Sequence, residues 1–338
     1  MRFDDVVLAS LHAVEATHRV PTADLEAELS AHLPRLGLLP GTLEALSGIT
    51  ARRFWDAEVQ PSDAATKAAR GAIEDAGVAP DRIGVLINTS VCRDYIEPST
   101  ACLVHGNLGL SEECLNFDLS NACLGFLNGM DLVAQMIERG QVDYGLVVDG
   151  ESSRFVVERT LERLRAPDAT PQTFRDNIAT LTLGSGAAAA VLTRSALAPD
   201  GHRFGGLVSL AASQHNQLCR GQVDWMKTDT TGLLSAGLEL ATRTWAKAEE
   251  ELEWSADALD HAVMHQVSKP HTEHLARTLG LDPARIPVIY PEHGNVGPAS
   301  VPMTLAKAAA EGRVRAGDRV ALMGIGSGLN CAMAEVIW

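Results

Sequence analysis

Two short apolar runs stand out in the first half of the chain. Residues 82–90 (RIGVLINTS) and 143–150 (DYGLVVDG) are rich in β-branched side chains and show no polar alternation. Because a strand covered on both faces has no solvent side, such continuous runs predict buried strands. Between them, residues 127–140 (LNGMDLVAQMIERG) carry apolar side chains at helical spacing and end on a glycine. This alternation predicts an α/β protein.

The same order of patterns occurs twice. Seventeen residues separate Cys123 from Gly140, and seventeen separate Asn295 from Gly312. In both stretches an amphipathic helix pattern runs to the glycine, and an aspartate and an apolar strand pattern follow. The repeat predicts two related halves, with Cys123 and Asn295 at matching helix starts.

Two segments interrupt this rhythm. Residues 154–180 are charged and predict a helical insertion, and residues 195–206 contain proline and glycine, as a linker does. We therefore predict an N-terminal half of residues 1–194, which includes the insertion, and a C-terminal half of residues 195–338.

Composition narrows the function classes. The chain has 338 residues, 46% of them hydrophobic, so it can bury a large core. Its net charge of −15 argues against nonspecific binding to nucleic acid or an anionic membrane. We expect no signal peptide, because residues 1–20 have no basic region ahead of a long apolar run, and we expect no membrane span, because no apolar stretch approaches about 20 residues. The six cysteines show no metal-ligand spacing, so we expect a cytoplasmic protein with free thiols and no metal.

Cys123 is the first candidate for chemistry. It follows the strand pattern CLNFDLS and precedes an apolar helix. Amides at a helix N-terminus lower a thiol pKa from about 8.5 toward neutrality, which predicts a nucleophilic thiolate. A cysteine flanked by alanine and leucine is also common as plain packing.

Two further residues favour the catalytic interpretation. His265 ends the buried run ALDHAVMH, and Asn295 lies in the glycine-bracketed turn EHGNVGPAS. Each alone is commonly a satisfied polar group at the end of a strand. Together they can donate hydrogen bonds to one developing enolate oxygen, and with Cys123 they supply what acyl transfer requires.

A glycine-rich loop near the C-terminus is a third element. In GIGSGLNC, Ser327 lies between Gly326 and Gly328, so the backbone can approach a ligand closely and offer amide donors. A packing turn is an equally good interpretation of this loop. The spacing does not match the dinucleotide-binding or serine-hydrolase motifs.

These motifs resemble those of the thiolase superfamily, in its ketoacyl-acyl carrier protein synthase III branch. SNACLGF is similar to the nucleophile motif, MHQVS to the histidine motif, EHGNVGPAS to the asparagine motif and GIGSGLNC to the oxyanion loop, and the resemblance covers nearly the whole chain. It implies a five-layered αβαβα fold, a dimer and acylation of Cys123 by a thioester. The amides of Cys123 and of the Ser327 loop would hold the acyl oxygen, while His265 and Asn295 stabilise an enolate.

The substrate contacts depart from that branch. The histidine motif ends on Ser268 where HQAN has asparagine, which changes one polar contact at the pantetheine entrance. Ser268, Gly326 and Gly328 form the substrate-binding set that the resemblance implies. The tryptophan and arginine that hold the adenine end of coenzyme A are missing before Gly48, so coenzyme A would be bound differently.

Glu97, in SVCRDYIEPSTA, is the second departure. In synthase III an apolar residue reaches from this place across the dimer interface into the partner's pocket. A carboxylate there can remove the α-proton of a plain acyl thioester, whereas decarboxylation of malonyl thioesters needs no base. The pattern is similar to OleA-type enzymes of olefin and β-lactone biosynthesis, which join two fatty acyl-CoA molecules head to head. Cys92 replaces a serine expected in this loop.

The resemblance thus implies an acyl-CoA condensing enzyme without a cofactor, giving a 2-alkyl-3-ketoacyl product. We expect a homodimer in which Glu97 acts across the interface, and a heterodimer with a paralogue stays open. The alternatives are a decarboxylative synthase using malonyl thioesters, a Cys/His thioesterase or acyltransferase, and a silent partner subunit of another synthase.

Overall fold

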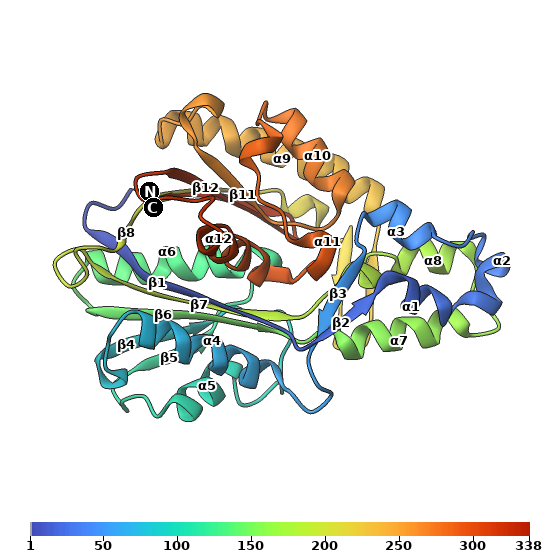
Figure 1. Ribbon diagram of the computed structural model, residues 1–338, viewed down its shortest axis with the longest axis horizontal. Helices are drawn as coiled ribbons and strands as arrows, with labels where there is room; N and C mark the ends of the chain where they lie inside the picture. The colour runs from blue at the N-terminus through green and yellow to red at the C-terminus, as the bar shows by residue number, and fades with distance from the viewer. Residues whose placement is uncertain (1) are drawn as a thin grey trace.

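The computed structural model describes residues 2–338 and stacks helices and sheets in five layers (Figure 1). Two pairs of helices form the outer layers and a third pair lies between the sheets. The outer pairs are α4 (Pro61–Asp75) with α5 (Thr100–Leu108), and α9 (Thr230–Glu251) with α10 (Lys269–Thr278). The central pair is α6 (Gly125–Glu138) and α12 (Ser300–Ala310). The predicted αβαβα fold is confirmed.

The strand order repeats between the halves. The N-terminal strands run, in spatial order, β1 (Val6–Glu15), β7 (Gly186–Arg194), β6 (Tyr144–Glu151), β4 (Ile83–Asn88) and β5 (Leu115–Asp118). The C-terminal strands run β8 (His202–Ala211), β13 (Asn330–Ile337), β12 (Arg319–Gly326) and β11 (His261–Met264). In each set the first two pairings are antiparallel and the third is parallel. Only β5, paired in parallel with β4, lacks a counterpart.

The two sets join into one nine-stranded sheet through a short contact. β1 pairs with β8 only at Val7 with Arg203 and Leu8 with His202. Residues 195–201 connect β7 to β8 and so link the halves along the chain. The central helices α6 and α12 also correspond between the halves. Each follows a 3-10 turn, and each is followed by a glycine of positive φ, Gly140 at 66° and Gly312 at 69°.

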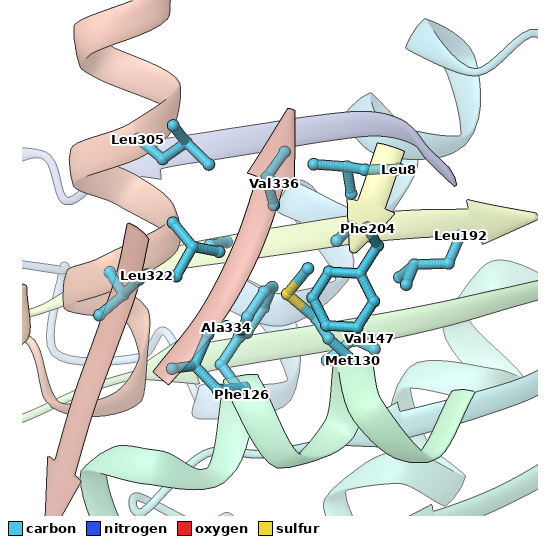
Figure 2. Close-up of a cluster of buried hydrophobic side chains, with 14 of the residues drawn as sticks. Leu8, Phe126, Met130, Val147, Leu192, Phe204, Leu305, Leu322, Ala334 and Val336 are labelled. Carbon is cyan, nitrogen blue, oxygen red and sulfur yellow. The ribbon is translucent and has the colours of Figure 1, made fainter. Parts of the chain in front are cut away.

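The central layer holds the largest core. Helix α6 contacts strands of both the N-terminal and the C-terminal set, so its side chains are buried on more than one face. Figure 2 shows Phe126 and Met130 of α6 beside Phe204 of β8 and Val147 of β6. Apolar side chains from both halves therefore share one core, which fixes the position of the α6 N-terminus.

A smaller lobe extends from one end of the layers (Figure 1). It contains the short helices α1 (Thr22–Ala27), α2 (Leu33–Leu36) and α3 (Thr42–Ser47), the hairpin of β2 (His18–Pro21) and β3 (Ala51–Phe54), and the helices α7 (Arg154–Arg165) and α8 (Pro171–Asn177). The last two form the helical insertion that the charged segment 154–180 predicts. The remaining strands and α-helix are β9 (Cys219–Gly221), β10 (Met226–Thr228) and α11 (Tyr290–His293). Among residues 2–338 no helix has the length and hydropathy of a membrane span.

Close packing of α4 on the sheet supplies a test of the fold. A Cβ at Gly150 of β6 would lie 2.2 Å from the Pro61 carbonyl oxygen and 2.7 Å from the Ala65 nitrogen, and backbone atoms cannot yield cheaply. We expect Gly150→Ala to lower the free energy of unfolding by about 3 kcal/mol. In Gly106→Ala on α5 the new Cβ meets no atom within 4 Å, so this control should stabilise by up to about 1 kcal/mol. If the two variants unfold at equal urea midpoints, the close contact of Gly150 with α4 is contradicted.

Candidate active site

Cys123 lies in a 3-10 turn, η3 (Ala122–Leu124), between β5 and α6. Ala122 has a φ of 45°, in the left-handed region, a conformation that costs on the order of 1 kcal/mol or more and is enriched at functional sites. Asn121 holds the turn from both sides: its Nδ2 donates to Asn128 Oδ1 at 2.6 Å, and its Oδ1 accepts from Asn330 Nδ2 at 2.9 Å. Side chains of both halves therefore position Cys123.

The loop between β12 and β13 lies directly against this turn. A Cβ at Gly326 would be 2.9 Å from the Asn121 carbonyl oxygen and 3.3 Å from the Leu124 nitrogen, so only glycine fits without a shift. Ser327 and Gly328 follow in the same loop. The structure thus brings the predicted oxyanion loop to the predicted nucleophile.

His265 follows β11 and is only 2% exposed. Its backbone N–H donates to the Met323 carbonyl at 2.7 Å, and its imidazole lies beside the backbone of Gly297. The ring nitrogen Nδ1 has no partner among the described residues.

Asn295 is fixed through its backbone and its side-chain oxygen. Its N–H donates to the Thr182 carbonyl at 2.8 Å, and its carbonyl accepts from the Gly184 N–H at 2.9 Å. Its Oδ1 accepts from the Gly297 N–H at 3.0 Å, which leaves Nδ2 as the free donor. Gly297 therefore contacts both Asn295 and His265, and its turn, η8 (Gly297–Ala299), packs against η3.

The other two predicted residues lie elsewhere. Glu97 is exposed in the loop between β4 and α5 of the single chain. The Ser268 hydroxyl accepts from the His271 N–H at 3.4 Å and so caps α10. For both residues a contact with substrate stays a prediction.

The expected lowering of the Cys123 pKa is wrong for this structure. Burial raises the pKa of the Cys123 thiol to about 12, and the negative charge of Glu151 adds to the shift, followed by Cys219 and Asp149. Desolvation and nearby carboxyls thus outweigh the helix N-terminus. The free site holds a thiol, which must lose its proton during acylation.

Burial has the opposite effect on the histidines. It lowers the pKa of His265 to about 3 and that of His271, on α10, to about 4. Both imidazoles are therefore neutral at pH 7. A neutral His265 can donate a hydrogen bond to an enolate oxygen, but it is a poor proton acceptor.

Two buried acids escaped the sequence analysis. Asp149 and Glu151 end β6, and burial raises the pKa of Glu151 to about 7 and that of Asp149 well above its usual value. The available signal was their alternation within the apolar run DYGLVVDGE, because carboxyls are rarely buried without a purpose. Asn121 and Asn330, which brace the Cys123 turn, were also missed.

Comparison with known proteins agrees with this geometry. Residues 117–211 match the family model of 3-oxoacyl-[acyl-carrier-protein] synthase III, and residues 250–338 match that of its C-terminal part. An acyl-CoA:acyl-CoA alkyltransferase of Xanthomonas campestris pv. campestris is 52% identical over 100% of both chains. One from Shewanella oneidensis is 38% identical, again over 100% of both. The chain belongs to the OleA family of synthase III-like condensing enzymes.

Solved structures of the OleA family share the fold throughout. Cerulenin-bound OleA of Xanthomonas campestris superposes with a TM-score of 0.98 at 52% identity, covering 100% of this chain and 98% of that one. Variants of the same OleA, substituted at one cysteine, one histidine or one glutamate, superpose with TM-scores of 0.97 to 0.98. The resemblance inferred from the motifs is confirmed, and the chain is an acyltransferase of the thiolase superfamily.

The contact at Gly326 predicts a local defect. In Gly326→Ala the new methyl group pushes on the Asn121 carbonyl and shifts the Cys123 turn. Because misplacement by about 1 Å can cost 100-fold in rate, we expect acylation of Cys123 to slow by about that factor. Stopped-flow release of coenzyme A measures it. Acylation at the wild-type rate would contradict the close approach.

The pKa of His265 predicts a pH dependence of stability. Between pH 3 and 6.5 the unfolded chain binds a proton at this imidazole that the folded chain excludes, so stability falls as pH drops through 6.5. His265→Asn removes this pH-dependent contribution to stability. Between pH 4 and 6, the free energy of unfolding of the variant should change less steeply with pH than that of the wild type, by about 1.4 kcal/mol per pH unit. Urea unfolding at fixed protein concentration measures the slope, and equal slopes would show that His265 is not buried neutral.

Proposed function

We propose that this OleA family member condenses two long-chain fatty acyl-CoA molecules head to head, without prior decarboxylation, to a 2-alkyl-3-ketoacyl product. The observation that carries the proposal is the packing around the Cys123 turn: the Gly326 loop and the turn that follows Asn295 both pack against it, and His265 is buried beside Gly297 of that second turn. Full-length identity to acyl-CoA:acyl-CoA alkyltransferases supports the choice of substrate.

The first half-reaction loads the enzyme. The Cys123 sulfur attacks the thioester carbonyl of one acyl-CoA, the new carbon–sulfur bond forms, and the bond to coenzyme A breaks. The thiol proton of Cys123 leaves with coenzyme A, which departs as a free thiol. Backbone amides of Cys123 and of the Gly326–Gly328 loop stabilise the tetrahedral oxyanion in this proposal.

The second half-reaction forms the carbon–carbon bond. Glu97 of the partner subunit removes the α-proton of a second acyl-CoA. His265 and the free Nδ2 of Asn295 donate hydrogen bonds to the resulting enolate oxygen. The enolate carbon attacks the Cys123 thioester, and the sulfur leaves as a thiolate. The product departs as the coenzyme A ester or, after hydrolysis, as the β-keto acid.

A surface beside Glu97 supports the homodimer. β5 is an edge strand of the sheet, and exposed apolar side chains gather on it and on the neighbouring loop: Val91, Tyr95, Ile96 and Leu115. Ile96, next to Glu97, is 92% exposed. An unpaired edge flanked by apolar side chains is a pairing surface. Two-fold pairing along β5 would carry each Glu97 toward the partner subunit.

The related crystal structures support the choice of residues. The substituted glutamate, cysteine and histidine in Xanthomonas OleA are separated by the same intervals as Glu97, Cys123 and His265 in this chain. On this ground we assign the three residues to base, nucleophile and enolate donor.

Myristoyl-CoA offered alone tests the reaction. We expect the wild type to give β-keto acid or its ketone, and Glu97→Gln to condense at least about 100-fold more slowly because the amide accepts no proton. Mass spectrometry of the extracted products measures both. Free fatty acid alone would indicate a thioesterase, and a requirement for malonyl-CoA would indicate a decarboxylative synthase.

Mixed dimers test whether Glu97 acts across the interface. Cys123→Ala and Glu97→Gln chains are each expected to be inactive alone. After unfolding and refolding together at equal amounts, hetero-pairs contain one complete site, so activity should recover to about a quarter of wild type. If the mixture remains inactive while wild-type chains refolded in the same way are active, Glu97 does not act in trans.

A further inference from the structure

Glu151 lies at the carboxyl end of β6, where it is 4% exposed. Its Oε1 accepts the Val91 N–H at 2.6 Å, and its Oε2 accepts the Cys92 N–H at 3.2 Å. Hydrogen bonds from two successive backbone amides fix the turn that opens the loop carrying Glu97.

The same side chain supports the opposite wall of the site. Gly297 has a φ of 54°, and a Cβ placed on it would lie 3.3 Å from Glu151 Cδ and 3.4 Å from Oε1. Gly297 is the residue whose N–H orients the Asn295 amide and whose backbone lies beside the His265 ring. Glu151 is thus wedged between the base of the Glu97 loop and the turn that holds the enolate donors.

We propose that Glu151 is a positioning residue for condensation, whose carboxylate fixes the Val91–Cys92 turn of the Glu97 loop and supports the Gly297 turn. The role of Glu151 in presenting Glu97 rests on the proposed function. The effect of Glu151 on the two turns and on the Cys123 pKa is independent of the proposed function.

The charge of Glu151 also reaches the nucleophile. The titratable groups that act on Glu151 or Cys123 are Asp149 on β6, Cys92 on the loop after β4, and Cys219 on β9. Among these, Glu151 contributes the largest electrostatic increase to the Cys123 pKa. Removing its charge therefore favours the Cys123 thiolate.

Two variants separate the shape of Glu151 from its charge. Glu151→Gln keeps the size but presents an amide NH₂ to one of the two backbone donors. Glu151→Asp keeps the charge but shortens the reach by one methylene. Glu335→Gln serves as the matched control, since Glu335 is a buried carboxyl bonded to Trp254 and Arg319.

Three measurements on the full-length protein decide the proposal. In Glu151→Gln we expect faster amide hydrogen exchange at Val91 and Cys92, and Cys123 alkylation by iodoacetamide that begins at lower pH. We also expect condensation of myristoyl-CoA at least about 10-fold slower, with the initial release of coenzyme A preserved. Glu151→Asp should slow condensation and leave the alkylation profile unchanged, and Glu335→Gln should change none of the three.

Unchanged exchange and alkylation in Glu151→Gln would overturn the proposal, whatever the activity. So would a loss of coenzyme A release and of condensation in equal proportion, because that pattern indicates general damage to the fold. Failure of the wild type to condense would instead overturn the proposed function, since exchange and alkylation would still report on Glu151.

Discussion

The site depends on the contact between the Cys123 turn and the C-terminal hairpin. Asn121 accepts a hydrogen bond from Asn330, and Gly326 lies too close to Asn121 and Leu124 for any side chain. The turn belongs to the first half and the hairpin to the second. Any shift between the halves therefore moves the nucleophile relative to the oxyanion loop, and the shared core around α6 prevents such a shift.

Burial at this junction explains the electrostatics. The same desolvation raises the pKa of Cys123 and Glu151 and lowers that of His265, so each group is driven toward its neutral form. Charges that arise during the reaction are then stabilised by oriented amides and neutral donors rather than by water. In the mechanism we propose, the base for the α-proton is Glu97 of the partner subunit, which lies outside these buried groups and is exposed in the single chain.

Local patterns were enough to predict an α/β protein with two related halves, whereas the five-layered fold was implied by the resemblance of the motifs. The strand runs, the repeated interval from Cys123 to Gly140 and from Asn295 to Gly312, and the insertion at 154–180 all follow from periodicity and turn residues, which are local properties. The motifs around Cys123, His265 and Asn295 identified the chemistry. The role of Glu151 and the raised Cys123 pKa could not be predicted in this way, because both depend on which segments, distant in sequence, cover a side chain.

The central claim is that Cys123 of this OleA family member carries the first acyl chain. It is tested most directly by intact-mass and peptide mass spectrometry of Glu97→Gln protein, in which we expect condensation to be slow, after brief incubation with myristoyl-CoA. The account predicts one myristoyl group per chain, located on Cys123. The double variant Cys123→Ala/Glu97→Gln should carry none. An unmodified chain, or a myristoyl group on another cysteine, would contradict it.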